Sequence, residues 1–211
     1  MPAFGIIFSM AKVKNHAAAV KALIRAKGIL RPRDLSERRI PRAVLGRLCE
    51  AGEITRTGRG LYVAGSEHMT EKHSLAEVAK LVPHGVVCLL SALQFHELTT
   101  QLPGEVWLAI PSKARRPKGN TVSIHPVYFS GAALKEGIEV HRIENVTVRV
   151  YSAAKTVADC FKARNKIGLD VALEALRDYW RKRKGTADVL WRYAKICRVA
   201  NVMQPYLESL A

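Results

Sequence analysis

Residues 41–64 read PRAVLGRLCEAGEITRTGRGLYVA, and this stretch decides the fold of the first part of the chain. Its opening proline is favourable at the start of a helix, and apolar residues then recur at helical spacing until Gly52 predicts the end of that helix. Two short runs, 53–56 and 60–64, predict a β-hairpin. The glycines between them supply the positive φ that a tight turn requires.

Two more helices are predicted upstream of this stretch. One covers residues 16–27 and ends at Gly28, and a short one covers 32–37, starting at a proline. Helix, short helix, helix and hairpin is the order of a winged helix-turn-helix. We therefore predict a winged helix-turn-helix domain over residues 15–66, preceded by a flexible arm at 1–14.

The charge of the chain indicates a polyanionic partner. The 211 residues carry 34 Lys and Arg against 18 Asp and Glu, a formal net charge of +16. Residues 1–66 contribute +9 of this excess, in under a third of the length. A chain with such a basic excess is typical of a protein that meets DNA, RNA or an anionic membrane surface. No stretch approaches the ~20 apolar residues of a membrane span, so we expect no membrane partner.

Arginine is concentrated where a winged helix contacts double-stranded DNA. A recognition helix presents its first turns to the major groove, where arginine reads guanine with two hydrogen bonds, and the wing and a basic arm contact the backbone or minor groove. The alternative is a solvated basic face. The predicted DNA-binding residues are Lys12, Lys14, Arg38, Arg39, Arg42, Arg47, Arg56 and Arg59.

Residues 67–211 predict a mixed α/β domain with a helical C-terminal part, which makes the whole chain α+β. Apolar runs predict strands at 86–90, 105–110 and 121–128, and a hairpin at 138–143 and 146–151. Helices are predicted over 74–81, after the capping residues Ser91, Ser130, Ser152, Asp170 and Thr186, and from Pro205. Two basic runs are either a secondary binding surface or solvated: Lys113, Arg115, Arg116 and Lys118, then Arg181, Lys182, Arg183 and Lys184.

Motifs for catalysis are missing from the sequence. His96-Glu97-Leu98-Thr99-Thr100 begins like a zinc-protease motif but lacks the second histidine, and no phosphate-binding glycine loop occurs. No Glu-x-Lys arrangement of a nuclease is present, and Asp159 is interpreted as a partner for Lys155 or Lys162. We expect a protein that is not an enzyme and needs no metal or cofactor.

The four cysteines, at positions 49, 88, 160 and 197, are widely spaced and show no zinc-binding pattern. We interpret them as reduced, buried thiols, which are typical of the cytoplasm. The apolar patch within residues 1–10 lacks the basic start and cleavage site of a secretory signal.

Four motifs, in this order, resemble one family: residues 28–35 (GILRPRDL), 58–63 (GRGLYV), 91–103 (SALQFHELTTQLP) and 150–159 (VYSAAKTVAD). The chain resembles the AbiEi-type antitoxins of type IV toxin–antitoxin systems, which are bacterial proteins also described as transcriptional regulators. The resemblance implies a winged helix that represses its own operon, at an operator expected to hold inverted repeats. It also implies a C-terminal domain that neutralises a nucleotidyltransferase-like toxin. A stand-alone regulator without a toxin is the alternative.

Overall fold

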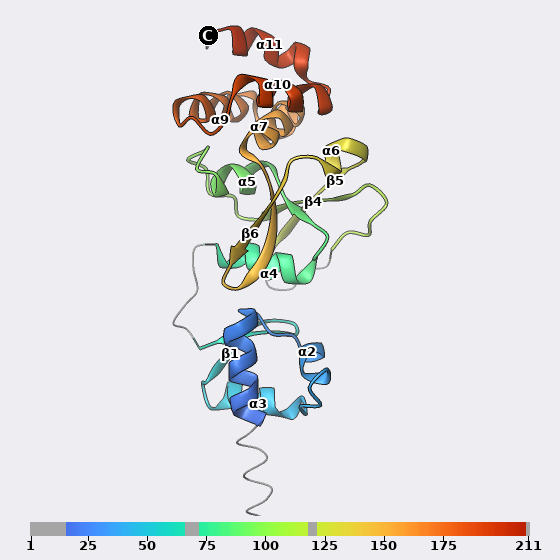
Figure 1. Cartoon of the computed structure of the whole chain (residues 1–211), viewed down its shortest axis with the longest axis vertical. Helices are drawn as coiled ribbons and strands as arrows, with labels where there is room; N and C mark the ends of the chain where they lie inside the picture. The colour runs from blue at the N-terminus through green and yellow to red at the C-terminus, as the bar shows by residue number, and fades with distance from the viewer. Residues whose placement is uncertain (1–15, 66–71, 118–121, 210–211) are drawn as a thin grey trace, which may run out of the picture.

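The computed structural model describes residues 16–65, 72–117 and 122–209, and Figure 1 shows them as two units stacked along the long axis. The N-terminal unit is residues 16–65, and the C-terminal unit is the rest of the described chain. Helices and sheets occur in both, so the predicted α+β class is confirmed. The predicted division into domains stays a prediction, and the arm at 1–14 lies outside the described residues. None of the described helices combines the length and apolarity that a membrane span requires.

Three helices and a hairpin make up the N-terminal unit. A helix at residues 16–27 is followed by α2 (Pro32–Ser36), α3 (Ala43–Glu50), β1 (Ile54–Gly58) and β2 (Leu61–Ala64). The strands pair in antiparallel fashion, and an isolated bridge joins Leu30 to Tyr62. One buried apolar cluster holds the helices together, with Val20, Leu23, Ile24, Leu35, Val44, Leu45 and Leu48 among its members.

A five-stranded mixed sheet forms the centre of the C-terminal unit, in the order β5-β4-β3-β7-β6. Its strands are β3 (Val86–Val87), β4 (Val106–Pro111), β5 (Ile124–Phe129), β6 (Ile138–Ile143) and β7 (Val146–Tyr151). The helices are α4 (His73–Leu81), α5 (Leu89–Phe95), α6 (Gly131–Lys135), α7 (Ala153–Lys162), α8 (Arg164–Ile167), α9 (Leu169–Arg181), α10 (Ala187–Ile196) and α11 (Ala200–Glu208).

Alternate side chains of the sheet enter two different apolar clusters, as the two-residue period of a strand requires. Val86 and Ala109 pack with the helices α5, α7, α9 and α10, whereas Val87 and Leu108 pack with α4. The second cluster also contains Ile29, Leu61 and Val63 of the N-terminal unit. The two units are therefore joined by buried apolar contacts and not by the chain alone.

The turn between β6 and β7 forms a second connection between the units. Glu144 and Asn145 both adopt positive φ, 47° and 62°, as a two-residue hairpin turn of this kind requires. The Asn145 side-chain amide donates a hydrogen bond to the Arg25 carbonyl at 2.9 Å, near the end of the first helix. His73 Nδ1 lies 2.5 Å from Glu144 Oε2, so the start of α4 contacts the same turn.

Several sequence predictions were wrong in detail. The apolar run 86–90 forms a strand only at Val86–Val87, because the chain turns at Leu89, with φ 44°, into α5. Ser91 consequently lies inside that helix, where its hydroxyl oxygen accepts a hydrogen bond from Trp107 N at 2.9 Å. Gly168, not Asp170, is the N-cap of α9, and Pro205 lies within α11 instead of opening it. All four cysteines are free, but Cys49 is only half-buried.

Candidate nucleic-acid interface

The turn between α2 and α3 positions the first group of arginines. Ile40, which is 6% exposed, anchors this turn in the apolar cluster, and its backbone N–H donates to the Leu35 carbonyl at 3.0 Å. Arg39 adopts a positive φ of 54° at the tip. Arg38, Arg39 and Arg42 are consequently exposed together on the outside of the turn.

Helix α3 presents one face to the core and the other to solvent. Val44, Leu45 and Leu48 are buried, at the i, i+1 and i+4 spacing of an amphipathic helix. Arg42, at the N-cap, and Arg47 are exposed. The helix lies at the end of the N-terminal unit away from the C-terminal unit (Figure 1), so the larger unit does not cover it.

Three of the four carboxylates in the described N-terminal unit pair with lysines, and none of the four pairs with these arginines. Lys21 contacts Glu53, and Lys27 Nζ lies 2.7 Å from Asp34 Oδ1 and 4.0 Å from Glu37 Oε2. Among the described residues, no carboxylate forms an ion pair with any of the arginines at the turn or on α3. The guanidinium groups there keep their donors available for an external anion.

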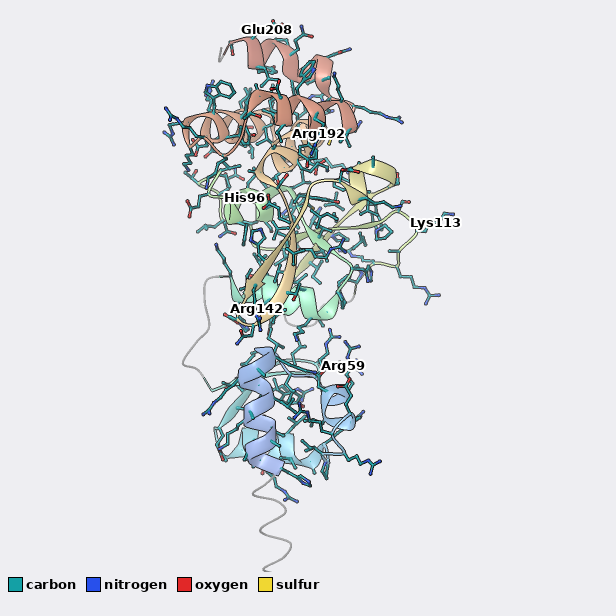
Figure 2. All side chains as sticks on the ribbon, in the orientation of Figure 1. Arg59, His96, Lys113, Arg142, Arg192 and Glu208 are labelled. Carbon is teal, nitrogen blue, oxygen red and sulfur yellow. The ribbon has the colours of Figure 1, made fainter. Side chains whose placement is uncertain are left out.

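The hairpin carries the remaining two predicted arginines. Arg56 is exposed, but its Nε donates to the Gly58 carbonyl at 3.2 Å, which holds its side chain along the turn. Arg59 is exposed at the turn, beside α2 (Figure 2). Gly60, with φ 74°, lies against the Pro32 ring, so the turn packs next to the first residues of α2.

A cationic group that sequence reasoning missed surrounds Asp34. Arg31, Arg33 and Lys80 act on one another electrostatically there, and Lys80 comes from α4 in the other unit. Burial and the neighbouring cations lower the pKa of Lys80, and burial together with Arg33 lowers the pKa of Arg31. Although burial raises the pKa of Asp34, hydrogen bonds from Lys27 and the Arg31 backbone outweigh it and hold that pKa below its ordinary value. We name Lys27, Arg31, Arg33 and Lys80 the cation cluster.

The other predicted basic residues have different surroundings. Lys12, Lys14 and Lys118 lie outside the described residues. Lys113, Arg115 and Arg116 are exposed on the loop after β4, from which Lys113 projects (Figure 2). The second run is partly engaged, because both Arg181 and Lys182 pair with Asp178, and Lys182 also donates to the Glu97 carbonyl. Arg183 and Lys184 are exposed.

His96 and Asp159 both have partners within the protein. His96 Nε2 donates to the Tyr151 carbonyl at 2.7 Å, and burial lowers the pKa of its imidazole. Asp159 is paired with Lys155 at 2.5 Å, as predicted. Among the described residues, no group of three or more His, Cys, Asp or Glu side chains could hold a metal ion.

Comparison with known proteins supports the resemblance in the N-terminal unit. A family model described as "Transcriptional regulator, AbiEi antitoxin" matches residues 19–65. The resemblance to the AbiEi regulators is confirmed over these residues. The matched segment contains α2, α3 and the hairpin, whereas the two motifs of the C-terminal unit lie outside it. No curated protein matches the chain.

A solved structure resembles the chain over both units. The crystal structure of the RV2827C protein from Mycobacterium tuberculosis covers 86% of this chain, which in turn covers 71% of that protein, with a TM-score of 0.56. Sequence identity is 12%, so the likeness concerns the fold alone.

Proposed function

We propose that residues 16–65 form a winged helix-turn-helix that binds double-stranded DNA and represses transcription of its own operon. In this proposal α3 enters the major groove and the hairpin is the wing. This proposal is supported by the matching family, which is described as a transcriptional regulator. The protein then acts by binding and not as an enzyme, and we infer that it works in the cytoplasm, with which four free cysteines agree.

The observation that carries this proposal is the set of unpaired arginines. Within the described N-terminal unit Asp34, Glu37 and Glu53 pair with Lys21 or Lys27, while Arg38, Arg39, Arg42 and Arg47 are exposed without an ion pair. Arginine in that state offers a rigid pair of donors to guanine or phosphate. The cation cluster lies beside the start of α2 and would add phosphate contacts.

Arg42→Ala and Arg59→Ala should each weaken binding to the DNA upstream of the protein's own gene. Loss of one phosphate contact is expected to lower the slope of log K against log salt by about 1, and loss of a base contact costs about 1–3 kcal/mol. Electrophoretic mobility shifts across a salt series, centred on ~150 mM, measure both quantities.

Arg177→Ala is the matched control, because Arg177 is also exposed but lies on α9, at the other end of the molecule. It should bind operator DNA as the unchanged protein does. Wild-type affinity and salt slope in both test variants would contradict the assignment of α3 and the hairpin to DNA. Because the operator is expected to hold inverted repeats, two retarded protein–DNA complexes should appear as the protein concentration rises.

Neutralisation of a nucleotidyltransferase-like toxin is a second proposed function, supported by the match of residues 19–65 to a family of AbiEi antitoxins. Exposed apolar side chains on α9 and α10 favour a protein partner: Leu169 is 37%, Trp180 39% and Val189 39% exposed. The product of a neighbouring toxin gene should co-purify with the chain, and Trp180→Ala should weaken the complex by about tenfold or more. Failure to co-purify while DNA binding persists would favour a stand-alone regulator.

A further inference from the structure

A cavity of about 450 Å³ opens in the C-terminal unit, at a place that DNA binding through α3 does not use. Its walls come from β5, α6 and the junction between α7 and α8, which Figure 1 shows on the side of the sheet next to α7. Small-molecule sites have volumes of roughly 300–1,000 Å³. The cavity therefore has room for one small ligand.

One wall of the cavity is aromatic. The Trp107 indole and the His125 imidazole are stacked, with ring centroids 3.9 Å apart and planes inclined by 23°. Phe129, two strand periods from His125 on the same face of β5, continues this wall. Aromatic side chains that line an open cavity provide a surface on which a planar ring can stack.

The floor of the cavity carries a buried carboxylate. Asp159 is only 2% exposed, and it is one of the residues that line the cavity, together with Cys197. Its Oδ2 accepts from Lys155 Nζ at 2.5 Å and its Oδ1 accepts from the Cys197 thiol at 3.2 Å. A carboxylate has about four acceptor positions, so capacity remains for N–H donors of a ligand.

Two lysines stand at the rim of the cavity. Lys162 ends α7 and Lys166 lies in α8, and both are exposed. Among the described residues no carboxylate forms an ion pair with either ammonium group. The rim is therefore cationic, whereas the floor accepts hydrogen bonds.

We propose that this cavity binds a purine nucleotide. The ring stacks on the wall of Trp107, His125 and Phe129, and N–H groups of the base donate to the Asp159 carboxylate. The phosphate then reaches Lys162 and Lys166 at the rim. A purine nucleotide combines a planar ring, ring-edge N–H donors and an anionic group, and the cavity offers a complement to each of the three.

Isothermal titration calorimetry with GMP and AMP tests the proposal on the full chain. We expect at least one to bind with a Kd on the order of 10–100 μM, the affinity of a ligand of this size with ordinary efficiency. Ribose 5-phosphate, which lacks the ring, should bind far more weakly. Absence of binding by both purine nucleotides would overturn the proposal.

Variants of the cavity test the binding of the phosphate and the binding of the base separately. Lys162→Ala combined with Lys166→Ala should weaken GMP or AMP about tenfold, yet leave the corresponding nucleoside unchanged because it has no phosphate. His125→Ala should weaken nucleotide and nucleoside alike. Lys135→Ala, at an exposed lysine of α6 outside the cavity, is the matched control. Unchanged nucleotide affinity in the double lysine variant would also overturn the assignment.

Discussion

Lys155→Met should lower the free energy of unfolding by about 3–5 kcal/mol, the cost of removing one partner from a buried ion pair. The Lys155 side chain is completely buried, and its ammonium group lies 2.5 Å from Asp159 Oδ2 and 4.2 Å from the centre of the Tyr151 ring. Methionine fills a similar volume, so the loss reports the uncompensated charge of Asp159 and not a cavity. Urea unfolding at pH 7 measures it.

The pH dependence of the free energy of unfolding shows why Lys155→Met is less stable than the unchanged protein. Burial raises the pKa of Asp159 above its unfolded value, and Lys155 opposes that rise. Without Lys155 the protonated carboxyl is favoured in the folded state, so stability falls as pH rises above the unfolded pKa. The variant should therefore lose less stability at pH 5 than at pH 7, relative to the unchanged protein. An equal loss at both values would assign it to packing instead.

Replacing both partners provides the matched control. Lys155→Met combined with Asp159→Leu removes both charges together and should be more stable than the single variant, because no charge remains buried alone. Cys197 would lose its acceptor in the double variant, but a thiol is a weak donor. A double variant less stable than Lys155→Met would show that the pair contributes through geometry beyond charge compensation.

The sequence correctly predicted the elements in which buried residues recur at the period of a strand or a helix. Val146, Val148 and Val150 alternate along a strand and are all buried, and the hairpin has the predicted bounds. The prediction of a strand over residues 86–90 was wrong because continuous apolar residues fit a buried strand and a buried helix equally well. Hydrogen bonds with Trp107, which is distant in the sequence, join the end of β3 and the first turn of α5 to β4.

The candidate interface could be predicted only in part, for a related reason. Arg38, Arg39 and Arg42 are neighbours in the sequence, so their shared turn follows from the predicted helices on either side. The cation cluster depends on Lys80, which reaches Arg31 and Arg33 only when the two units pack together. No local pattern encodes that packing. The motif at residues 28–35 contains Arg31 and Arg33 of the cation cluster, but it did not indicate that they take part in binding.

Gly28→Ala should separate the two units, because a side chain at Gly28 would meet the Glu144 backbone of the C-terminal unit. A Cβ atom there would lie 1.5 Å from the Glu144 carbonyl oxygen, which belongs to backbone and cannot rotate away. The positive φ of 69° adds a cost of about 1–2 kcal/mol for any residue with a side chain. We expect a total loss of about 3 kcal/mol in the free energy of unfolding, together with faster hydrogen exchange at the β6–β7 turn.

Gly52→Ala separates these two contributions. Gly52 has a φ of 70°, nearly that of Gly28, but nothing lies within 4 Å of an added Cβ. It should therefore show the conformational cost alone, about 1–2 kcal/mol, with exchange at the β6–β7 turn unchanged. The difference between the two variants measures the contact between the units, including the hydrogen bond from Asn145 to Arg25. Equal losses in both variants would mean that this contact contributes little, and that the N-terminal unit holds its position through the apolar cluster around Ile29.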